Sequence, residues 1–252
     1  MLLKDKVGIV TGASRGIGKS IACALAGEGA RVVVAARTRL HIKDISGTIA
    51  ETAEEIREAG GEALAIKTDI TKEISIEKMV QETLYQWGRI DILVNNAATN
   101  FPNKFEEMSQ KHWDKIMDVN LRGTVLCTRA VLPTMMQQHY GHIINISSVV
   151  TQKLSHAPFT GIAYDVSKVA MNRLTQGLAE ELKEHGIAVN ALMPDNTASE
   201  GWSYLNPDVD TSGWDSPATW GRYAAQVAAL DPATFTGNLL TKDDLNTIQG
   251  NM

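Results

Sequence analysis

The chain has 252 residues, of which 44% are hydrophobic and 21% are charged, as is usual for a folded globular protein. Basic residues number 24 and acidic residues 29, so the net charge of −5 argues against a nucleic-acid-binding surface, which needs an excess of basic groups. Two cysteines are too few for a disulfide framework or a zinc site. The sequence lacks an apolar run of about 18 residues and a basic N-terminal segment before an apolar one, so we expect a cytoplasmic protein without a membrane span.

Short runs rich in β-branched residues alternate with helical patterns along most of the chain. The predicted strands are residues 7–11, 31–35, 63–68, 90–95, 142–147 and 188–193. The predicted helices are residues 19–27, 49–59, 76–87, 110–139 and 164–184. The strands are nearly continuous apolar runs, which is typical of strands covered on both faces. This alternation predicts an α/β fold in which one domain, residues 1–252, is built on a doubly wound parallel sheet.

Two segments interrupt the alternation. Residues 38–48 form an extra stretch after the second strand, and residues 195–235 form a long irregular segment with three prolines. The second segment holds six of the 14 aromatic residues, namely Trp202, Tyr204, Trp214, Trp220, Tyr223 and Phe235. Such a segment is typical of a substrate pocket wall, and equally of an oligomer contact or a lid packed against the core. We therefore expect a substrate-covering segment at about 195–235 and leave these alternatives open.

A glycine-rich turn, Thr-Gly-Ala-Ser-Arg-Gly-Ile-Gly at residues 11–18, joins the first strand to the first helix. Glycines at this place let backbone N–H groups approach a pyrophosphate at the helix N-terminus. The same residues contain Gly12-Ala-Ser14-Arg-Gly16, the G-x-S-x-G pattern of the nucleophile elbow in serine hydrolases. That elbow also needs an acid and a histidine later in the chain. No histidine stands out, so a dinucleotide site is favoured over a hydrolase that uses Ser14.

Tyr164 and Lys168 are four positions apart and fall on one face of a predicted helix. A free phenol has a pKa of about 10, and a neighbouring ammonium group lowers it, although this spacing is also common between surface neighbours. Ser148 follows the strand before this helix, and Asn95 ends the previous strand at the same edge, where ligands bind in open α/β sheets. Asn120 lies inside the longest predicted helix, which we expect it to disturb.

Together these motifs resemble the short-chain dehydrogenase/reductase family. The resemblance rests on the turn at 11–18, Asn-Asn-Ala at 95–97, Asn120, Ser148 and Tyr-x-x-x-Lys at 164–168, and it covers nearly the whole chain in the family's order. It implies a Rossmann-type oxidoreductase that interconverts a secondary alcohol and a ketone with hydride carried by NAD(P)(H). It also implies a homodimer or homotetramer packed through the long helices.

The resemblance further implies a role for each matching residue. Tyr164 is the expected general acid/base, and Ser148, with Ser147 as the alternative, orients the substrate oxygen. Lys168 is expected to bind the nicotinamide ribose and to lower the pKa of the tyrosine. Asn120 is expected to hold a water molecule that relays the proton. The expected dinucleotide contacts are Gly12, Ser14, Arg15, Gly16, Ile17, Gly18, Arg37, Asp69, Ile70, Asn95, Ala97, Tyr164, Lys168, Pro194 and Thr197.

The end of the second predicted strand bears on the choice between NAD and NADP. NAD sites usually carry an acid there for the ribose 2′-hydroxyl, but this chain has Val-Ala-Ala-Arg-Thr at 34–38. Arg37 and Arg15 suit a 2′-phosphate, which a carboxylate would repel. We therefore expect NADP(H) rather than NAD(H). Asp69 resembles the family's adenine-contacting acid and equally suits a loop that caps a helix.

The chain departs from the family pattern at two places, where Asp195 replaces the glycine after Pro194 and Ala98 replaces the glycine of Asn-Asn-Ala-Gly. The segments at 38–48, 187–191 and 235–238 are similar to the hydroxysteroid dehydrogenase-like branch. The expected partner is a small apolar carbonyl or alcohol substrate, not a nucleic acid or a membrane.

Two other classes of protein are weighed against an enzyme. A non-catalytic dinucleotide sensor on the same fold would not need Tyr164 and Lys168 together. A scaffold or interaction protein is disfavoured because the sequence contains no internal repeat.

Overall fold

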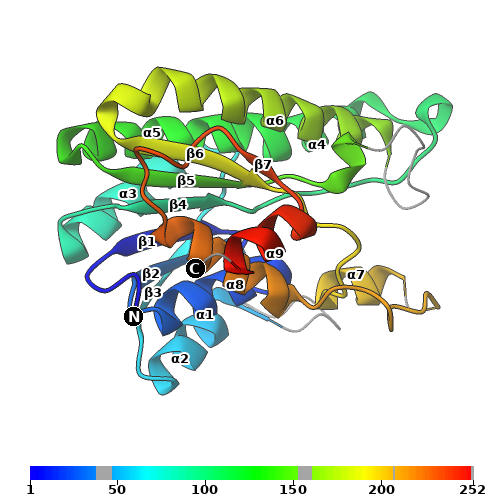
Figure 1. Cartoon of the computed structure of the whole chain (residues 1–252). Coiled ribbons are helices and arrows are strands. Elements are labelled where there is room, and N and C mark those ends of the chain that lie inside the picture. Colours follow the sequence, from blue (N-terminus) through cyan, green and yellow to red (C-terminus); the bar gives the residue numbers. More distant parts are fainter. Residues whose placement is uncertain (38–46, 153–160, 207, 251–252) are drawn as a thin grey trace.

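The computed structural model describes residues 1–37, 47–152, 161–206 and 208–250. In these residues seven parallel strands form one sheet in the order β3-β2-β1-β4-β5-β6-β7 (Figure 1). The strands are β1 (Val7–Thr11), β2 (Arg31–Ala36), β3 (Glu62–Lys67), β4 (Ile92–Asn95), β5 (Gly141–Ile146), β6 (Ile187–Leu192) and β7 (Leu239–Leu240). The strand order reverses between β1 and β4. Open sheets of this kind bind ligands outside the carboxyl ends of the strands at such a switch point.

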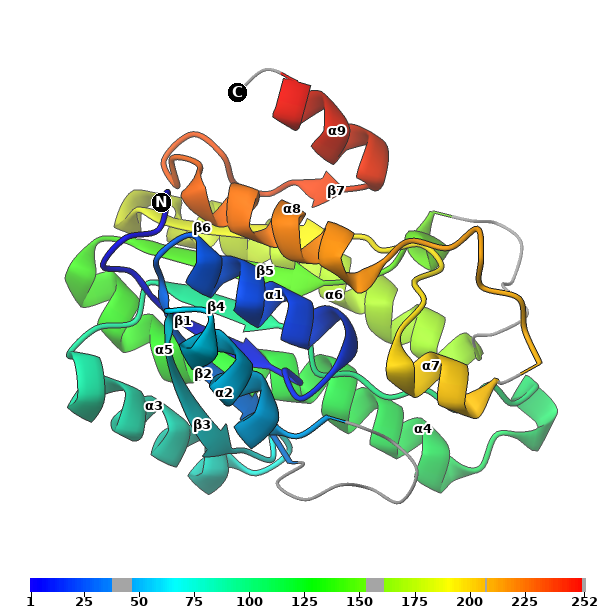
Figure 2. The ribbon, with the colours of Figure 1, turned by 90° about the horizontal axis from the view of Figure 1, so that it is seen from below.

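Helices cover both faces of the sheet (Figure 2). Their bounds are α1 (Gly16–Gly27), α2 (Ile49–Glu58), α3 (Glu73–Trp87), α4 (Gln110–Met117), α5 (Gly123–Gln138), α6 (Ile162–Leu182), α7 (Glu200–Leu205), α8 (Pro217–Ala229) and α9 (Lys242–Gly250). One apolar layer includes Leu25, Ile56 and Trp220 from α1, α2 and α8. The other includes Met79 from α3 and Val131 from α5 on the opposite face. These layers explain why the strands are apolar on both sides.

The structure confirms the predicted doubly wound parallel sheet, and each of the six predicted strands lies within two residues of an observed one. The long helix predicted at 110–139 is instead three elements, because a π-helical turn, Asp118–Arg122, separates α4 from α5. Strand β7 was not predicted, since its two residues are too short to show a periodic pattern. Most of the extra stretch predicted at 38–48 lies outside the described residues.

Part of the aromatic segment belongs to the core, which corrects the expectation of an irregular segment throughout 195–235. Helix α8 begins after Ser216, whose hydroxyl accepts a hydrogen bond from the Ala218 N–H at 3.3 Å. Trp220 and Tyr223 on this helix are buried at 0% and 3% exposure. A Cβ on Gly221 would lie 2.5 Å from the Ser20 carbonyl oxygen, so this glycine permits the close packing of α8 on α1.

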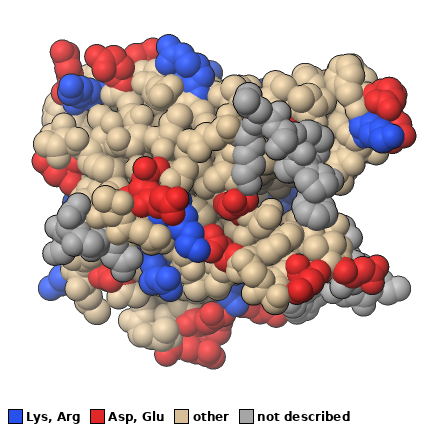
Figure 3. Space-filling model, turned by 45° about the vertical axis from the view of Figure 1, so that its right-hand side comes forward, with Lys and Arg blue, Asp and Glu red and all other residues tan. Residues whose placement is uncertain are grey.

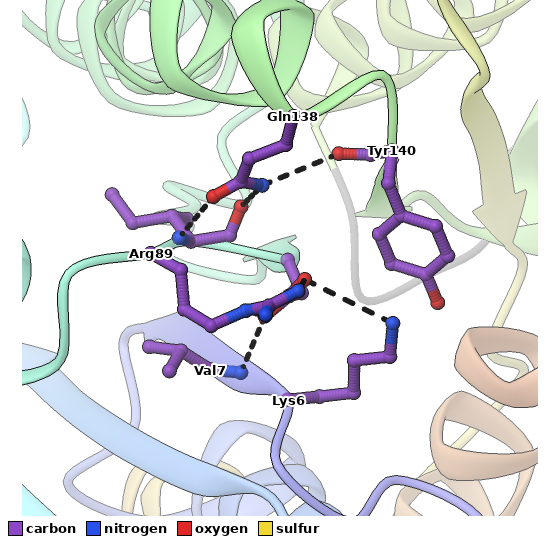
Figure 4. A network of polar contacts seen from close by, with 7 residues as sticks. Lys6, Val7, Arg89, Gln138 and Tyr140 are labelled. Carbon is purple, nitrogen blue, oxygen red and sulfur yellow. Dashed lines mark hydrogen bonds and ion pairs between the residues drawn. The ribbon is translucent and has the colours of Figure 1, made fainter.

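A polar network closes the amino-terminal edge of the sheet (Figure 4). The carboxylate of Asp91, which is fully buried, accepts hydrogen bonds from the Val7 N–H at 2.9 Å and from the Arg89 guanidinium at 2.6 and 2.8 Å. The Lys6 ammonium lies 4.0 Å from the same carboxylate and 3.5 Å from the centre of the Tyr140 ring. The network joins the start of β1 to the segments before β4 and β5.

Replacing Asp91 by asparagine is expected to lower the free energy of unfolding by about 2–3 kcal/mol, because Arg89 and Lys6 then lose the one buried negative charge that they share. Urea unfolding followed by circular dichroism measures this. Turnover per folded molecule should stay at the wild-type value, since Asp91 precedes β4 and lies at the edge opposite the strand carboxyl ends. A wild-type unfolding midpoint would contradict the structural importance of this carboxylate.

Candidate active site

The glycine-rich turn is held in place by its neighbours on β1 and β4. The Thr11 hydroxyl donates to the Val94 carbonyl oxygen at 3.1 Å and accepts from the backbone N–H groups of Asn96 and Ala97 at 3.0 and 3.2 Å. The Asn96 side-chain amide donates to the carbonyl oxygens of Thr11 and Gly12 at 2.9 and 3.2 Å. These bonds fix the direction in which the turn presents its backbone. Asn96 is not among the predicted site residues, although it stands between the predicted Asn95 and Ala97.

Two glycines of this turn are required for steric reasons. Gly12 has a φ of +66°, and a Cβ there would lie 2.8 Å from Ala97 Cα. A Cβ on Gly18 would lie 2.3 Å from the Asn96 amide nitrogen and 2.5 Å from the Gly12 carbonyl oxygen. Any larger side chain would therefore displace the turn. The result is a bare backbone surface at the start of α1, where the unpaired N–H groups of a helix favour an anion.

A cavity of about 420 Å³ opens beside this turn at the carboxyl edge of the sheet. Figure 3, which brings this edge forward, shows a hollowed surface where basic and acidic side chains lie next to one another. Most of the predicted dinucleotide contacts line the cavity: Gly12, Ser14, Arg15, Gly16, Ile17, Gly18, Arg37, Asp69, Ile70 and Ala97. The sequence-predicted residues are therefore brought together from the ends of β1, β2, β3 and β4.

The charged groups in this cavity are partly engaged by the protein. The Arg15 guanidinium donates to the Gly47 carbonyl oxygen at 2.9 Å. Asp69 accepts from the Thr71 N–H at 3.0 Å and from the Thr71 hydroxyl at 2.8 Å. Burial raises the pKa of Asp69, but the Thr71 hydrogen bonds and the nearby positive charge of Arg37 outweigh it and hold the pKa below its usual value. Arg37 itself is exposed at the mouth of the cavity.

Five of the predicted contacts do not line this cavity: Tyr164 and Lys168, which are described below, and Asn95, Pro194 and Thr197. The Asn95 side chain is buried between the sheet and α5, where its amide donates to the Thr128 hydroxyl at 3.2 Å and to the Asn145 side chain at 2.9 Å. Asn96, one residue later, takes the place at the cavity because successive strand residues point to opposite faces. Pro194 and Thr197 follow β6 and are not among the residues that line this cavity; the Thr197 hydroxyl donates to the Asp195 carbonyl oxygen at 2.9 Å.

Helix α6 begins at the carboxyl edge of the sheet and carries Tyr164 in its first turn and Lys168 one turn later. The Ser148 side chain is close enough to the Tyr164 phenol to lower its pKa, and the Ser148 hydroxyl donates to the Pro194 carbonyl oxygen at 3.5 Å. The Lys168 ammonium is 5.4 Å from the centre of the Tyr164 ring and donates to the Ile146 carbonyl oxygen at 2.6 Å. The Ser147 hydroxyl points instead toward the Lys168 carbonyl oxygen at 3.5 Å. The geometry thus places Ser148, not Ser147, beside the phenol.

Burial dominates the acid–base properties of this group. It raises the pKa of Tyr164 to about 12, with a smaller opposite contribution from the Ser148 hydrogen bond. It lowers the pKa of Lys168, a residue that is 2% exposed, to about 7. The phenol is therefore protonated at neutral pH, while the buried amine loses its proton more readily than a free lysine. A protonated phenol is suited to giving a proton to an oxygen that gains negative charge.

Asn120 lies in the π-helical turn, which confirms that this position disturbs the helix. Its side chain accepts from the Thr99 N–H at 2.8 Å and donates to the Thr99 carbonyl oxygen at 3.0 Å and to the Ser167 hydroxyl at 3.1 Å. The amide is therefore occupied with the loop after β4 and with α6, the helix of Tyr164. In this arrangement Asn120 positions both elements, and its expected hold on a water molecule stays a prediction.

A second cavity, of about 450 Å³, lies on the side of β6 and β7 and reaches Val149, the residue that follows Ser148. Its lining residues are Val149, Gln152, Met193, Asp195, Asn196, Gly213, Trp214, Asp215, Thr241, Lys242 and Asp243. Trp214 packs edge-on against Trp202 with ring centres 4.3 Å apart. Two of the aromatic residues predicted to cover the substrate thus meet beside this cavity, whereas Trp220 and Tyr223 do not.

The geometry offers the nucleophile-elbow hypothesis no support. Ser14 is buried at 6% exposure. Of the described histidines, His139, His142 and His185 lie near the amino ends of β5 and β6, at the edge opposite the glycine-rich turn. His112 stacks on the Phe101 ring at 4.1 Å. None of these imidazoles is placed as the general base that such a serine needs.

Metal sites and membrane-spanning helices are absent from the residues that the structure describes. No group of three or more histidine, cysteine, aspartate or glutamate side chains there is arranged to hold a metal ion. Nor does any described helix combine the length and apolar character that a bilayer crossing requires.

Known proteins that resemble this chain in sequence or structure are dehydrogenases and oxidoreductases. Residues 6–210 match the family model for short chain dehydrogenases. An uncharacterized oxidoreductase of Staphylococcus saprophyticus is 36% identical over 196 residues, which are 76% of this chain and 78% of the relative. Another from Staphylococcus aureus is 32% identical over 193 residues, covering 77% of this chain and 78% of the relative.

Solved structures agree. A proposed dehydrogenase from Xanthomonas campestris has a TM-score of 0.86 at 33% identity, covering 98% of this chain and 90% of the other. A metagenomic short-chain oxidoreductase in complex with NADP has a TM-score of 0.78 at 32% identity, covering 96% and 98%. The matched residues include the glycine-rich turn and the Tyr-x-x-x-Lys helix. The chain therefore belongs to the short-chain dehydrogenase family of nicotinamide-dependent oxidoreductases.

Proposed function

We propose that this protein is an NADP(H)-dependent oxidoreductase that interconverts a secondary alcohol and a ketone. The observation that carries the proposal is the Lys168 ammonium 5.4 Å from the Tyr164 ring centre and one helical turn away, with Ser148 beside the phenol, at the sheet edge that also bears the glycine-rich cavity. A dinucleotide fits this cavity because the turn presents bare backbone where any Cβ would collide. Gly12, Gly16 and Gly18 would hold the pyrophosphate, and Arg37 and Asp69 would face the adenosine end.

The chain's own residues supply the proton in this reaction. Tyr164, protonated at neutral pH, gives its hydroxyl proton to the substrate oxygen as negative charge develops there. Ser148 orients the same oxygen through its hydroxyl. The Lys168 ammonium stabilises the phenolate that remains, and the phenolate is reprotonated from solvent. A bound dihydronicotinamide supplies the hydride, which no side chain can provide.

The preference for NADP rests on Arg37 and on the absence of an acid at the end of β2. The structural relative that was solved with NADP is consistent with it. Arg37→Asp is expected to lower the ratio of kcat/KM for NADPH to that for NADH by about 100-fold, because it removes a cation and adds a charge that repels the 2′-phosphate.

Steady-state kinetics with both dinucleotides measures this ratio. Arg222→Asp makes the same change of charge on an exposed position of α8, and it should leave the ratio unchanged. An unchanged ratio in the Arg37 variant would remove the argument for a 2′-phosphate.

The substrate is proposed to be a small apolar carbonyl or alcohol compound. The cavity next to Ser148 offers Trp214, Met193 and Val149 to an apolar body. Asp195 and Asp215 at the same cavity disfavour substrates with negative charge in this part. The similarity to the hydroxysteroid dehydrogenase-like branch stays a prediction and does not identify a steroid.

We also propose a homodimer or homotetramer that packs through α6. This helix exposes Ile162, Val166 and Val169 at 39%, 38% and 52%, and their spacing places them along one face. Light scattering on the purified protein tests this assembly.

The proposed activity is tested by screening ketones and aldehydes for oxidation of NADPH, followed by the absorbance of the reduced cofactor. Turnover of an apolar ketone is the expected result. Tight NADPH binding without turnover of any carbonyl or alcohol in a broad panel would instead favour the dinucleotide sensor.

A further inference from the structure

Helix α1 receives its anionic partner from a distant part of the chain. Arg15, the N-cap residue before α1, gives no side-chain cap, and the first turn of the helix contains no acidic residue. The Gly16 N–H instead donates to a carboxylate oxygen of Glu200 at 2.9 Å, although the two residues are 184 positions apart. A carboxylate at a helix N-terminus interacts favourably with the helix dipole. This is the same N–H surface to which the proposed dinucleotide would present its pyrophosphate.

The segment that carries Glu200 also closes one side of the dinucleotide cavity. Ser199 and Gly201, its two neighbours, line the cavity together with the glycine-rich turn. A Cβ on Gly16 would lie 3.2 Å from Ser199 Cβ and 3.8 Å from the Glu200 carboxylate, so the start of α7 lies directly on the turn. Glu200 is therefore at the cavity wall and not on a remote surface.

Among the described residues, the segment that carries Glu200 is held at its N-terminal end by backbone pairing with Asp215. Thr197 forms a parallel bridge with Asp215, the Ala198 N–H donates to the Asp215 carbonyl oxygen at 2.9 Å, and the Asp215 N–H donates to that of Asn196 at 3.0 Å. Lys242 pairs with the Asp215 carboxylate. After these paired residues, the hydrogen bond from the Gly16 N–H to the Glu200 carboxylate joins the segment to α1. The positive charge of Lys19 on α1 also attracts this carboxylate.

We propose that Glu200 is an affinity-setting residue of the dinucleotide site, where its carboxylate competes with the cofactor pyrophosphate for the N-terminus of α1. The inference rests on the proposed dinucleotide-binding function and adds a residue to it. Two anionic groups cannot share the Gly16 N–H without repulsion. Binding of the cofactor therefore displaces the carboxylate, and α7 is released from the glycine-rich turn at the same time. Since Trp202 on α7 contacts Trp214 at the second cavity, this exchange links cofactor binding to the wall of the substrate cavity.

The test compares Glu200→Gln with the wild type by titrating NADPH fluorescence. The variant keeps the shape of the side chain and loses its charge, so NADPH should bind about three- to tenfold more tightly. Glu58→Gln, an exposed position on α2, makes the same change of charge away from the cavity and should leave the Kd unchanged. Adenosine 2′-monophosphate, which lacks a pyrophosphate, should bind all three proteins equally.

A second measurement needs no cofactor. Glu200→Ala removes the hydrogen-bond acceptor, so chymotrypsin should cleave near Trp202 faster than in the wild type or in Glu58→Gln. Equal NADPH affinity in wild type and Glu200→Gln would overturn the inference, and so would an equal gain in Glu58→Gln or equal cleavage rates. If neither wild type nor variants bind NADPH or NADH, the proposed function fails as well, which separates that outcome from the others.

Discussion

Tyr164→Phe is expected to lower kcat for carbonyl reduction by about 10²- to 10⁴-fold while NADPH binding stays nearly intact. The variant removes a single oxygen, which is the hydroxyl beside Ser148. General acid catalysis by a positioned group contributes a factor of this size, and the apolar ring that remains keeps the packing of α6. The expected loss therefore appears in the chemical step and not in cofactor affinity.

The two quantities are separated by steady-state kinetics and by titration of NADPH fluorescence on the same preparations. Tyr140→Phe provides a matched control, because it removes the same atom at the opposite edge of the sheet, and it should retain wild-type turnover. Equal losses of turnover and of NADPH affinity in Tyr164→Phe would indicate a structural role for this tyrosine.

Lys168→Met is expected to abolish most of the activity and yet to stabilise the protein at neutral pH. Activity should fall about 100-fold or more, because the phenolate that forms during reduction loses its nearby positive charge. Stability should rise by about 1–3 kcal/mol at pH 7, because burying an amine that is charged in the unfolded chain costs more free energy than its hydrogen bond to Ile146 returns.

The pH dependence of this difference follows from the direction of the pKa shift. Burial lowers the pKa of Lys168 from 10.5 to about 7 in the folded protein. Between these two values the unfolded chain binds more protons, so the stability contributed by this group rises with pH. The methionine variant lacks this pH-dependent contribution. Its advantage should therefore be near its maximum at pH 7 and below, and should shrink as the pH approaches 10.5.

Thermal unfolding at several pH values measures the advantage, with about 2–4 °C expected for each kcal/mol in a chain of this size. Lys19→Met on α1 serves as the control, since this amine is partly exposed and paired with Glu55, and its loss should not stabilise the protein. Destabilisation by Lys168→Met over the whole pH range would show that the lysine is mainly structural.

The sequence predicted the sheet well because its signal is local. Each of the first six strands contains a short apolar run, in most of them with valine or isoleucine, and such runs form strands when both faces are covered. Helix α8 was missed within the segment 195–235, although Ser216 followed by Pro217 is a recognisable start of a helix. Strand β7 carries no such local signal, since its place depends on pairing with β6.

The candidate site was predictable where spacing fixes geometry. The glycine-rich turn and the pair Tyr164 and Lys168 lie where the motifs place them, because a turn and a helical repeat of four residues determine relative positions locally. Asn95 shows where prediction from the sequence fails. Neighbouring strand residues point to opposite faces, so a prediction that is off by one residue assigns a core side chain to the cavity. Glu200 could not be predicted from local patterns, because its contact with Gly16 joins residues 184 positions apart.

Transfer of deuterium from NADPH labelled at its hydride-donating carbon tests the central claim most directly. With a ketone identified in the screen, mass spectrometry should find one deuterium on the carbinol carbon of the product, formed by the wild type and nearly absent in the same time with Tyr164→Phe. The accompanying hydroxyl proton should come from solvent through the tyrosine. Product without deuterium on that carbon, or equal rates of label transfer by the two proteins, would contradict hydride transfer assisted by Tyr164.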